Sequence, residues 1–388
     1  MKKYLFIFLL SLLFNFPSQA DHQNETYAFN KMHKYKIDKS ENYHKFDYDL
    51  QDNDLSKKVA EQLKNKKTTN LVSYLLYEDG KIKIDQQTKS KYGKYYPSHS
   101  IGKSLVSVVT GYAVCEGYID SVQSNIDYPT VKNTLYENQK LLHLLNMTAG
   151  DDLYIGARYF NKDNRIQGKG KSVSSVPLEK IIKKYFLGTE RTPLSSWNTT
   201  TGETSSGLVY NYSAMATNII MNYVIYKTGD DWEKLLHKIF VEDAKVENEV
   251  YFGKSLEKSK VGNKKSGEYG RYSFYAQRDD YLRIGLMVMN HWNNDTCVGK
   301  YLKTMFENRV DKNKQSTNTE SASQYSHSYG GQFHFDIVGL EDKKILAMDG
   351  FGGQQLIIDF DKKRIISVAS TDRHYDWYEI VYKTLEKD

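Results

Sequence analysis

Several features are scarce or missing in this sequence, and each one narrows the classes of function to consider. The 388 residues include only two cysteines, and they contain neither a His-Glu-x-x-His pattern nor a Cys/His cluster, so a metal site is not expected. A phosphate-binding glycine loop of the Walker type is also missing. The net charge of +6 is too small to indicate nucleic-acid binding. No segment after the N-terminus is apolar over the roughly 20 residues that a membrane span needs.

The first twenty residues have the composition of a secretory signal peptide. Two lysines follow Met1, Tyr4–Leu13 is apolar, and Ser18-Gln19-Ala20 supplies the small residues that precede a cleavage site. We therefore expect cleavage before Asp21 and a periplasmic or secreted protein with no stable membrane span. An uncleaved membrane anchor is the alternative, although the apolar run is shorter than the roughly 20 residues of a span.

The two cysteines, Cys115 and Cys297, could pair in an oxidising compartment. Cys115 falls on an apolar stretch that we expect to be helical. We therefore expect two separate buried thiols, with a disulfide as the alternative.

The order of polar and apolar segments indicates how the chain is organised. Residues 21–70 are polar and lysine-rich, which predicts an N-terminal extension with one helix near 55–63. Two strands follow around a turn at Asp79-Gly80, and then an apolar helix from Ser100 to Glu116. The stretch from about 120 to 290 is mostly helical in pattern. The pattern at the end of the chain predicts four strands, at 331–340, 344–349, 354–360 and 364–370, and a last helix at 377–385.

Early and late strands therefore bracket a helical middle. The simplest packing is an α/β fold in which the strands form one antiparallel sheet flanked by helices, with a mostly helical subdomain inserted at about 120–290. A turn at Asp361-Lys362-Lys363 suits an antiparallel hairpin between the last two strands. Residues 71–388 would then form the main domain, which is long enough for a large core.

Ser100-Ile101-Gly102-Lys103 is the strongest indication of chemistry in the sequence. A serine and a lysine three residues apart at the start of an apolar helix share one helix face, and the serine lies near the positive end of the helix dipole. Such a pair can activate a hydroxyl nucleophile without a histidine. The spacing alone is weak evidence, because Ser255-Leu256-Glu257-Lys258 repeats it within a hydrophilic run. Only Ser100 has strands before it and an apolar helix after it.

Further segments follow in an order that resembles the beta-lactamase-related serine hydrolases. They are Ser98-His-Ser-Ile-Gly-Lys-Ser104, the turn at Glu116–Ser121, and Leu142-His-Leu-Leu-Asn-Met-Thr-Ala-Gly150. That family includes class C beta-lactamases, DD-peptidases, esterases and 6-aminohexanoate-dimer hydrolases, and the chain is most similar to the last group. The resemblance runs from about residue 71 to the C-terminus, and it implies a beta-lactamase/transpeptidase-like fold.

The second motif of this family is Tyr-x-Asn or a close variant. The resemblance places it at Tyr212-Ser213-Ala214, with Tyr210 as the competing tyrosine. Ala214 stands where the family has Asn or Ser, and a methyl group cannot donate the hydrogen bond that an amide would supply.

The third motif of the family is usually Lys-Thr-Gly or His-x-Gly on a core strand. Lys227-Thr228-Gly229 matches these letters, but we assign it to the end of a helix, where glycine and lysine are both favoured. The better match is the segment around Gly350, Phe351, Gly352 and Gly353, which resembles the Gly-x-Gly-Gly-Gln of the aminohexanoate-hydrolase branch. This segment has Asp349 but no basic residue, which argues against recognition of a substrate carboxylate as in beta-lactams.

The resemblance implies an acyl-enzyme on Ser100, with Lys103 and Tyr212 as acid and base partners and no cofactor. An oxyanion would lie between the Ser100 N–H and an N–H of the Gly350–Gly353 segment. The substrate would be a small ester, amide or short peptide, with beta-lactamase or DD-peptidase activity less expected. We expect packing or structural roles for His99 and His143. The alternative is a non-catalytic cell-wall binding or sensor protein on the same fold.

Overall fold

The computed structural model describes most of the chain from residue 29 onward. The described residues are 29–30, 32–65, 69–88, 94–150, 197–198, 203–204, 207–208, 210–254, 270–312 and 319–387. The expected signal peptide and the second Ser-x-x-Lys match at 255–258 lie outside them. Among the described residues, no helix has the length and apolar character of a membrane span. The same residues contain no group of three or more His, Cys, Asp or Glu side chains that could hold a metal ion.

Nine strands form the larger sheet, and they come from both ends of the described chain. They are β2 (Asp47–Tyr48), β3 (Leu71–Glu78), β4 (Lys81–Gln87), β11 (Val310–Asp311), β12 (Ser326–Gly330), β13 (Phe333–Ile337), β14 (Ile345–Asp349), β15 (Gln355–Asp359) and β16 (Arg364–Ser370). Their order across the sheet is β11-β12-β13-β14-β15-β16-β3-β4-β2, and only β2 and β4 pair in parallel. Because β3 pairs with β16, the expected antiparallel sheet of early and late strands is confirmed.

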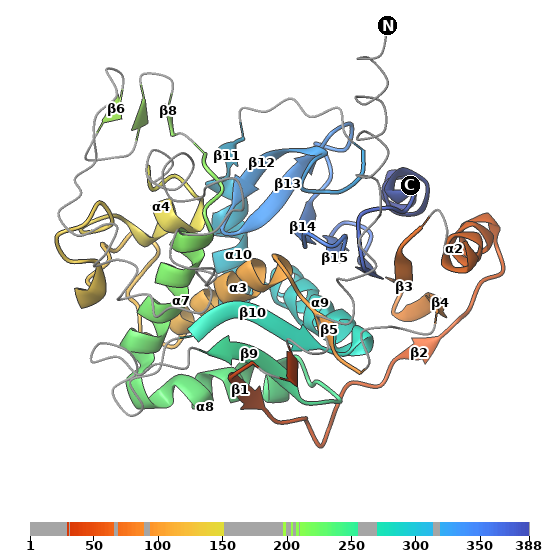
Figure 1. Ribbon diagram of the computed structural model, residues 1–388, viewed down its shortest axis with the longest axis horizontal. Coiled ribbons are helices and arrows are strands. Elements are labelled where there is room, and N and C mark those ends of the chain that lie inside the picture. The colour runs from red at the N-terminus through yellow and green to blue at the C-terminus, as the bar shows by residue number, and fades with distance from the viewer. Residues whose placement is uncertain are drawn as a thin grey trace, which may run out of the picture.

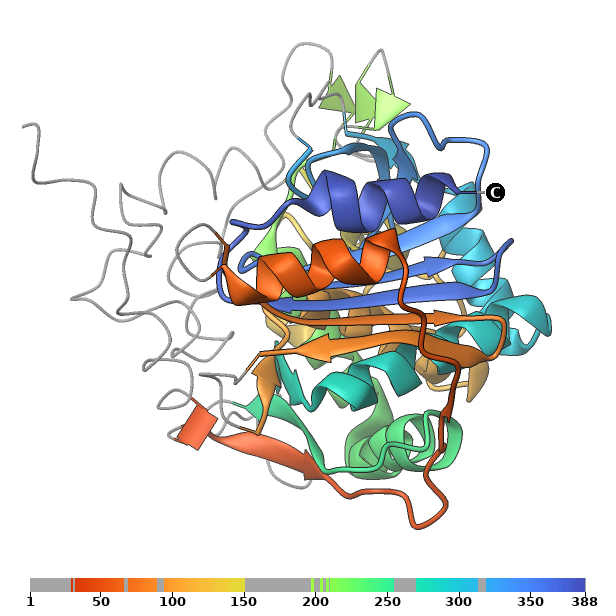
Figure 2. The ribbon, with the colours of Figure 1, turned by 90° about the vertical axis from the view of Figure 1, so that its right-hand side faces the viewer.

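Helices cover both faces of this sheet, and β14, β15 and β16 are accordingly buried at every position. On one face lie α2 (Asp54–Lys64) and the C-terminal segment, a π-helical turn (Tyr378–Tyr382) that continues into α11 (Lys383–Glu386) (Figure 2). On the other face α9 (Arg278–Asn293) packs against β15 and β16. Gly285 allows this close packing, because a Cβ there would lie 3.0 Å from Leu356 Cδ1.

A second, smaller sheet lies on the far side of the apolar helix α3 (Ile101–Cys115) (Figure 1). Its order is β1-β9-β10-β5, with β1 (Lys34–Ile37), β9 (Val250–Lys254), β10 (Gly270–Ala276) and β5 (Tyr96–Pro97). Helix α3 contacts β10 of this sheet and β14 of the larger one. The polar segment before residue 70 therefore supplies β1, β2 and α2 to the packed structure. The region at 120–290 supplies β9 and β10 to this sheet, although its mostly helical pattern did not predict them.

The remaining elements are a 3-10 turn (Pro129–Val131), α4 (Leu141–Leu145), the short strands β6 (Trp197–Asn198), β7 (Glu203–Thr204) and β8 (Gly207–Leu208), α7 (Ala214–Thr228), a 3-10 turn (Gly229–Asp231), α8 (Trp232–His237), a π-helical turn (Lys238–Asp243) and α10 (Cys297–Glu307). Among them, α7, α8 and α10 contact α3. Helix α7 ends at Gly229, which has a positive φ of 56° and donates its N–H to Ile225 O. Lys227 in the last turn forms an ion pair with Asp127. The Lys227-Thr228-Gly229 segment is therefore a helix end, as expected.

A disulfide joins Cys115, the last residue of α3, to Cys297, the first residue of α10. The expectation of two separate thiols was wrong. The two residues are 182 positions apart, so only the packing of α3 against α10 brings them together. That packing is close, because Gly111 faces the Tyr301 ring and Ser107 Oγ lies 2.8 Å from the Tyr301 hydroxyl.

Candidate active site

Ser100 lies at the N-terminus of α3, and the turn before it is held firmly. Ser98 donates its N–H to Phe274 O at 2.8 Å and accepts the Phe274 N–H on its Oγ at 3.0 Å. His99 has a positive φ of 45°, and its carbonyl accepts the Gly102 N–H. The Ser100 side chain makes no capping hydrogen bond to the helix, so its hydroxyl is available to other groups.

Lys103 is the group nearest to this hydroxyl. Its Nζ donates a hydrogen bond to Ser100 Oγ at 2.8 Å, and the residue is only 3% exposed. Among the described residues, no carboxylate lies within ion-pair distance of its amine. Burial disfavours an unpaired ammonium and lowers the pKa of Lys103. The structure thus brings together the serine and lysine that the sequence placed on one helix face.

Two tyrosine rings form the walls around the Lys103 amine. Its Nζ lies 4.8 Å from the ring centroid of Tyr212 and 4.3 Å from that of Tyr272. Aromatic faces attract a cation, and the Tyr272 side chain acts to raise the pKa of Lys103 against the larger effect of burial.

Tyr272 was not identified from the sequence, because no motif distinguishes it among 32 tyrosines. It lies on β10 where the register shifts between Arg271 and Phe274, so Tyr272 and Ser273 form a bulge that can direct a side chain toward α3. The Ser-x-x-Lys glycine permits this approach, because a Cβ on Gly102 would lie 1.9 Å from Tyr272 O.

Tyr212, just before α7, is the tyrosine that reaches Ser100. The Ser100 side chain acts to lower the pKa of Tyr212, but the larger effect of desolvation raises it to about 12. The residue is 42% exposed, so one side of it faces the solvent. The competing Tyr210 packs instead against the Tyr329 ring, with centroids 5.1 Å apart.

The Met-Thr-Ala-Gly segment after α4 holds the Tyr212 segment in place. Asn211 donates its N–H to Met147 O at 2.7 Å, and the Ser213 N–H lies 3.2 Å from Met147 Sδ. Ser213 then caps α7 by accepting the Ala216 N–H on its Oγ. The Met-Thr-Ala-Gly segment thus fixes the start of the helix that follows Tyr212.

Gln332 joins the three helices of the site and was also missed in the sequence. It is 1% exposed, accepts a hydrogen bond from Ser104 Oγ of α3 on its backbone oxygen, and accepts one from Thr217 Oγ1 of α7 on its side-chain oxygen. Its amide donates to Leu145 O of α4. The only sequence signal was its place in the β12–β13 hairpin after two glycines.

The glycine segment Gly350–Gly353 connects β14 to β15 and lies against the turn before Ser100. A Cβ on Gly350 would lie 2.8 Å from Ser98 O, so the segment can approach only because this residue is glycine. Gly350 donates its N–H to Gln354 O, and Gly353 donates to Gly350 O. Across the described residues, the N–H groups of Ser100, Phe351 and Gly352 have no protein acceptor. The Phe351 side chain is 79% exposed.

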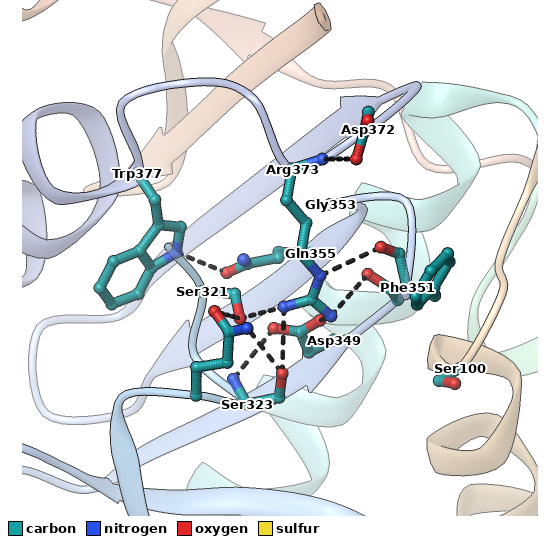
Figure 3. A network of polar contacts seen from close by, with 12 residues as sticks. Ser100, Ser321, Ser323, Asp349, Phe351, Gly353, Gln355, Asp372, Arg373 and Trp377 are labelled. Carbon is teal, nitrogen blue, oxygen red and sulfur yellow. Dashed lines mark hydrogen bonds and ion pairs between the residues drawn. The ribbon is translucent and has the colours of Figure 1, made fainter. Parts of the chain in front are cut away.

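A positive charge reaches this segment from elsewhere in the chain. Arg373, beyond the end of β16, pairs with Asp349 at 2.8 Å between Nη2 and Oδ1, and its Nε donates to Phe351 O at 3.0 Å (Figure 3). Burial raises the pKa of Asp349, and Arg373 opposes that rise. The Gly350–Gly353 segment contains no basic residue, as the sequence showed, but Arg373 brings a positive charge next to it.

The two histidines named in the sequence, His99 and His143, are partly buried. Desolvation, together with the charges of Lys103 and Arg373, lowers the pKa of His99 to about 4, which makes its ring a weak proton acceptor. His143 lies on the short helix α4, which is buried at its four leucines.

Comparisons with known proteins give a likeness of structure and not of sequence. No family model matches the chain, and no curated protein does. A Bacillus anthracis protein proposed to be a 6-aminohexanoate-dimer hydrolase superposes with a TM-score of 0.62 at 14% identity, over 95% of this chain and 93% of the other. A Bacteroides dorei protein proposed to be a beta-lactamase gives 0.56 at 12%, over 85% and 97%. A penicillin-binding protein from Bacillus halodurans gives 0.53 at 12%, over 86% and 99%.

These likenesses cover most of each chain at low sequence identity, so what they establish is the fold. The chain has the beta-lactamase/transpeptidase-like α/β fold that the sequence resemblance implied.

Proposed function

We propose that this protein is a serine hydrolase that cleaves an ester or amide bond of a small substrate through an acyl-enzyme on Ser100. One observation carries the proposal: the buried Lys103 amine lies 2.8 Å from Ser100 Oγ, and the Tyr212 ring lies 4.8 Å from the same amine. A nucleophile within hydrogen-bond reach of a base, with a third group beside both, is the arrangement that covalent catalysis needs.

The two proton-transfer groups differ in their resting protonation. Burial lowers the pKa of Lys103, which favours the neutral amine that can accept the Ser100 proton. Desolvation raises the pKa of Tyr212 to about 12, so its hydroxyl is protonated at neutral pH and can supply a proton to the leaving group. We therefore assign Lys103 as the base of acylation and Tyr212 as the acid. A water molecule then attacks the acyl-enzyme, with Tyr212 accepting a proton from the water and Lys103 returning a proton to Ser100. No cofactor is required.

The oxyanion of the tetrahedral intermediate needs donors that are not already used. The Ser100 N–H is one, and the N–H groups of Phe351 and Gly352 are the unused donors of the glycine segment among the described residues. Loss of one such donor typically lowers kcat about 10²–10³-fold.

The names of several structural neighbours favour hydrolysis of an amide or ester. Besides the Bacillus anthracis protein, they include a D-stereospecific amidohydrolase from Streptomyces and a class C beta-lactamase in complex with cefoxitin. The Cys115–Cys297 disulfide supports a periplasmic or secreted location, since disulfides persist in oxidising compartments.

The alternative function is that of a non-catalytic cell-wall binding or sensor protein. It rests on Ala214, which gives the second motif no side-chain donor. A fluorophosphonate probe and p-nitrophenyl ester hydrolysis separate the two functions. We expect the wild type to be labelled and to turn over, and Ser100→Ala to do neither. Ser255→Ala, which removes the other Ser-x-x-Lys serine, serves as the matched control and should behave as wild type.

If the wild type and Ser100→Ala label and turn over equally, the Ser100 mechanism is wrong. With activity established, panels of esters, linear amides and beta-lactams would define the substrate class. We expect esters and linear amides to be cleaved faster than beta-lactams, because the glycine segment itself carries no basic residue to bind the beta-lactam carboxylate.

A further inference from the structure

We propose that Arg373 is a positioning residue of this site, whose guanidinium orients the glycine segment so that the Phe351 and Gly352 N–H groups face the carbonyl attacked by Ser100. The inference rests on the proposed hydrolase function. It assigns a role in the reaction to a residue that lies outside the Ser-Lys-Tyr group and beyond the end of β16.

The orientation follows from which atoms Arg373 binds. Its Nε donates to Phe351 O at 3.0 Å, and its Nη2 lies 3.3 Å from Gly350 O. In a trans peptide the C=O and the following N–H point in opposite directions. Holding the carbonyls of Gly350 and Phe351 on the Arg373 side therefore turns the N–H groups of Phe351 and Gly352 to the opposite side.

Those two N–H groups are the ones without a protein acceptor among the described residues, whereas the neighbouring Gly350 and Gly353 N–H groups are used within the turn. In Figure 3 the segment with Phe351 lies between the Arg373 guanidinium and Ser100. The approach of Gly350 to Ser98 O places the same segment beside the start of α3. The unused donors thus belong to the part of the segment nearest to the nucleophile.

The guanidinium itself is held from several directions. Nη2 pairs with Asp349 Oδ1 at 2.8 Å, and Nη1 contacts the hydroxyls of Ser321 and Ser323. The second oxygen of Asp349 accepts the Ser323 N–H at 2.9 Å, and the Asp349 side chain is fully buried. A buried network in which each member has a partner is rigid.

The planar fork of arginine is needed for this arrangement. Nε and Nη2 of Arg373 bind the two successive carbonyls of Phe351 and Gly350. Nη2 also pairs with Asp349, and Nη1 binds the two serine hydroxyls. A lysine ammonium cannot divide its donors among these acceptors in the same way. We therefore expect Arg373→Lys to keep the charge but to lose most of the orienting effect.

The test is the kinetics of p-nitrophenyl butyrate hydrolysis by Arg373→Gln and Arg373→Lys, with the inhibition constant of phenylboronic acid measured on the same proteins. A boronate adduct on Ser100 is tetrahedral and uses the oxyanion donors, whereas ground-state binding does not depend on them. We expect kcat to fall about 10²–10³-fold, KM to change by less than about threefold, and the boronate inhibition constant to rise in parallel with the loss of kcat.

Arg364→Gln is the matched control. Arg364 lies at the other end of β16, where it is also buried and binds a carboxylate and a backbone carbonyl, those of Glu78 and Thr384. We expect this variant to lose stability without a change in kcat or in boronate inhibition. The same result for Arg373→Gln would overturn the positioning role and leave a structural one.

A rise in KM with unchanged kcat in the Arg373 variants would also overturn the inference, because Arg373 would then bind the substrate directly. Failure of the proposed function is seen separately: the wild type would then neither hydrolyse the ester nor depend on Ser100 for labelling.

Discussion

Lys103→Met separates the chemical demands of the site from the stability of the fold. Lys103 is 3% exposed, and among the described residues it has no carboxylate within ion-pair distance. Burial lowers the pKa of its amine, so the folded state disfavours the charge that the amine carries in water. We expect the substitution to abolish hydrolysis and yet to raise the free energy of unfolding.

The magnitude follows from the surroundings of the amine. Removing an ion from water costs several kcal/mol in a real protein. The rings of Tyr212 and Tyr272, at 4.8 and 4.3 Å, offset part of that cost, about 0.5–2 kcal/mol for each contact. Methionine has a similar shape and carries no charge, so we expect a net gain on the order of 1–3 kcal/mol. Without its base the enzyme should lose about 10²–10⁴-fold in kcat.

The pH dependence gives a second measure of the same effect. The pKa of Lys103 is lowered in the folded protein from its usual value of 10.5, so between the two values the unfolded chain binds more protons than the folded one. Stability therefore rises with pH in that interval, by about 1.4 kcal/mol for each tenfold difference in proton affinity. Wild type should show this rise as the pH approaches 10.5, and Lys103→Met should lack it.

Urea denaturation at a series of pH values, with p-nitrophenyl ester hydrolysis on the same samples, measures both effects. Lys83→Met is the control, because Lys83 is 8% exposed but forms an ion pair with Asp49 at 2.8 Å. That pair raises the pKa of Lys83, so its loss should lower stability. If Lys103→Met is destabilised in the same way, the buried ammonium is a net stabiliser and the reasoning is wrong.

Three further predictions concern the disulfide and the walls of the site. Replacing Cys115 and Cys297 by serine should lower the free energy of unfolding by about 2–5 kcal/mol in urea denaturation, with kcat unchanged. Tyr272→Phe removes the hydroxyl through which Tyr272 acts to raise the pKa of Lys103; the rising limb of the pH–rate profile should move to lower pH and kcat should fall about tenfold. Phe351, 79% exposed, should matter for binding only: Phe351→Ala should raise KM for p-nitrophenyl octanoate, leave KM for the acetate unchanged, and leave the melting temperature unchanged.

Much of the fold could be predicted because its signals are local. The strands from residue 345 to 370 and the hairpin that begins at residue 71 are short apolar runs bounded by turn residues, and each was placed within a few residues. The start of α3 could be predicted for the same reason, since a serine, a lysine and an apolar run are adjacent. Ser100 and Lys103 could therefore be selected as candidate residues without knowledge of the tertiary structure.

What could not be predicted depends on contacts between distant parts of the chain. β9 and β10 pair with each other although the hydrophilic run at 255–269 separates them in the sequence. Next to that run, the aromatic pattern of two short strands was not recognised. The disulfide needs α3 and α10 to pack, and no spacing in the sequence reports that packing. Gln332 is one glutamine in a hairpin turn until Ser104 and Thr217 are seen to bind it.

The departures from the family motifs are where the distant contacts matter most. Ala214 gives Lys103 no side-chain hydrogen bond from the second motif, and the bulge in β10 brings Tyr272 to the same amine. The glycine segment lacks its own basic residue, and Arg373 brings a guanidinium to its carbonyls from beyond β16. Arg373 is occupied with Asp349 and the segment backbone, so it orients donors and has little capacity left for a substrate carboxylate. We therefore propose that neutral esters and amides are better substrates than beta-lactams.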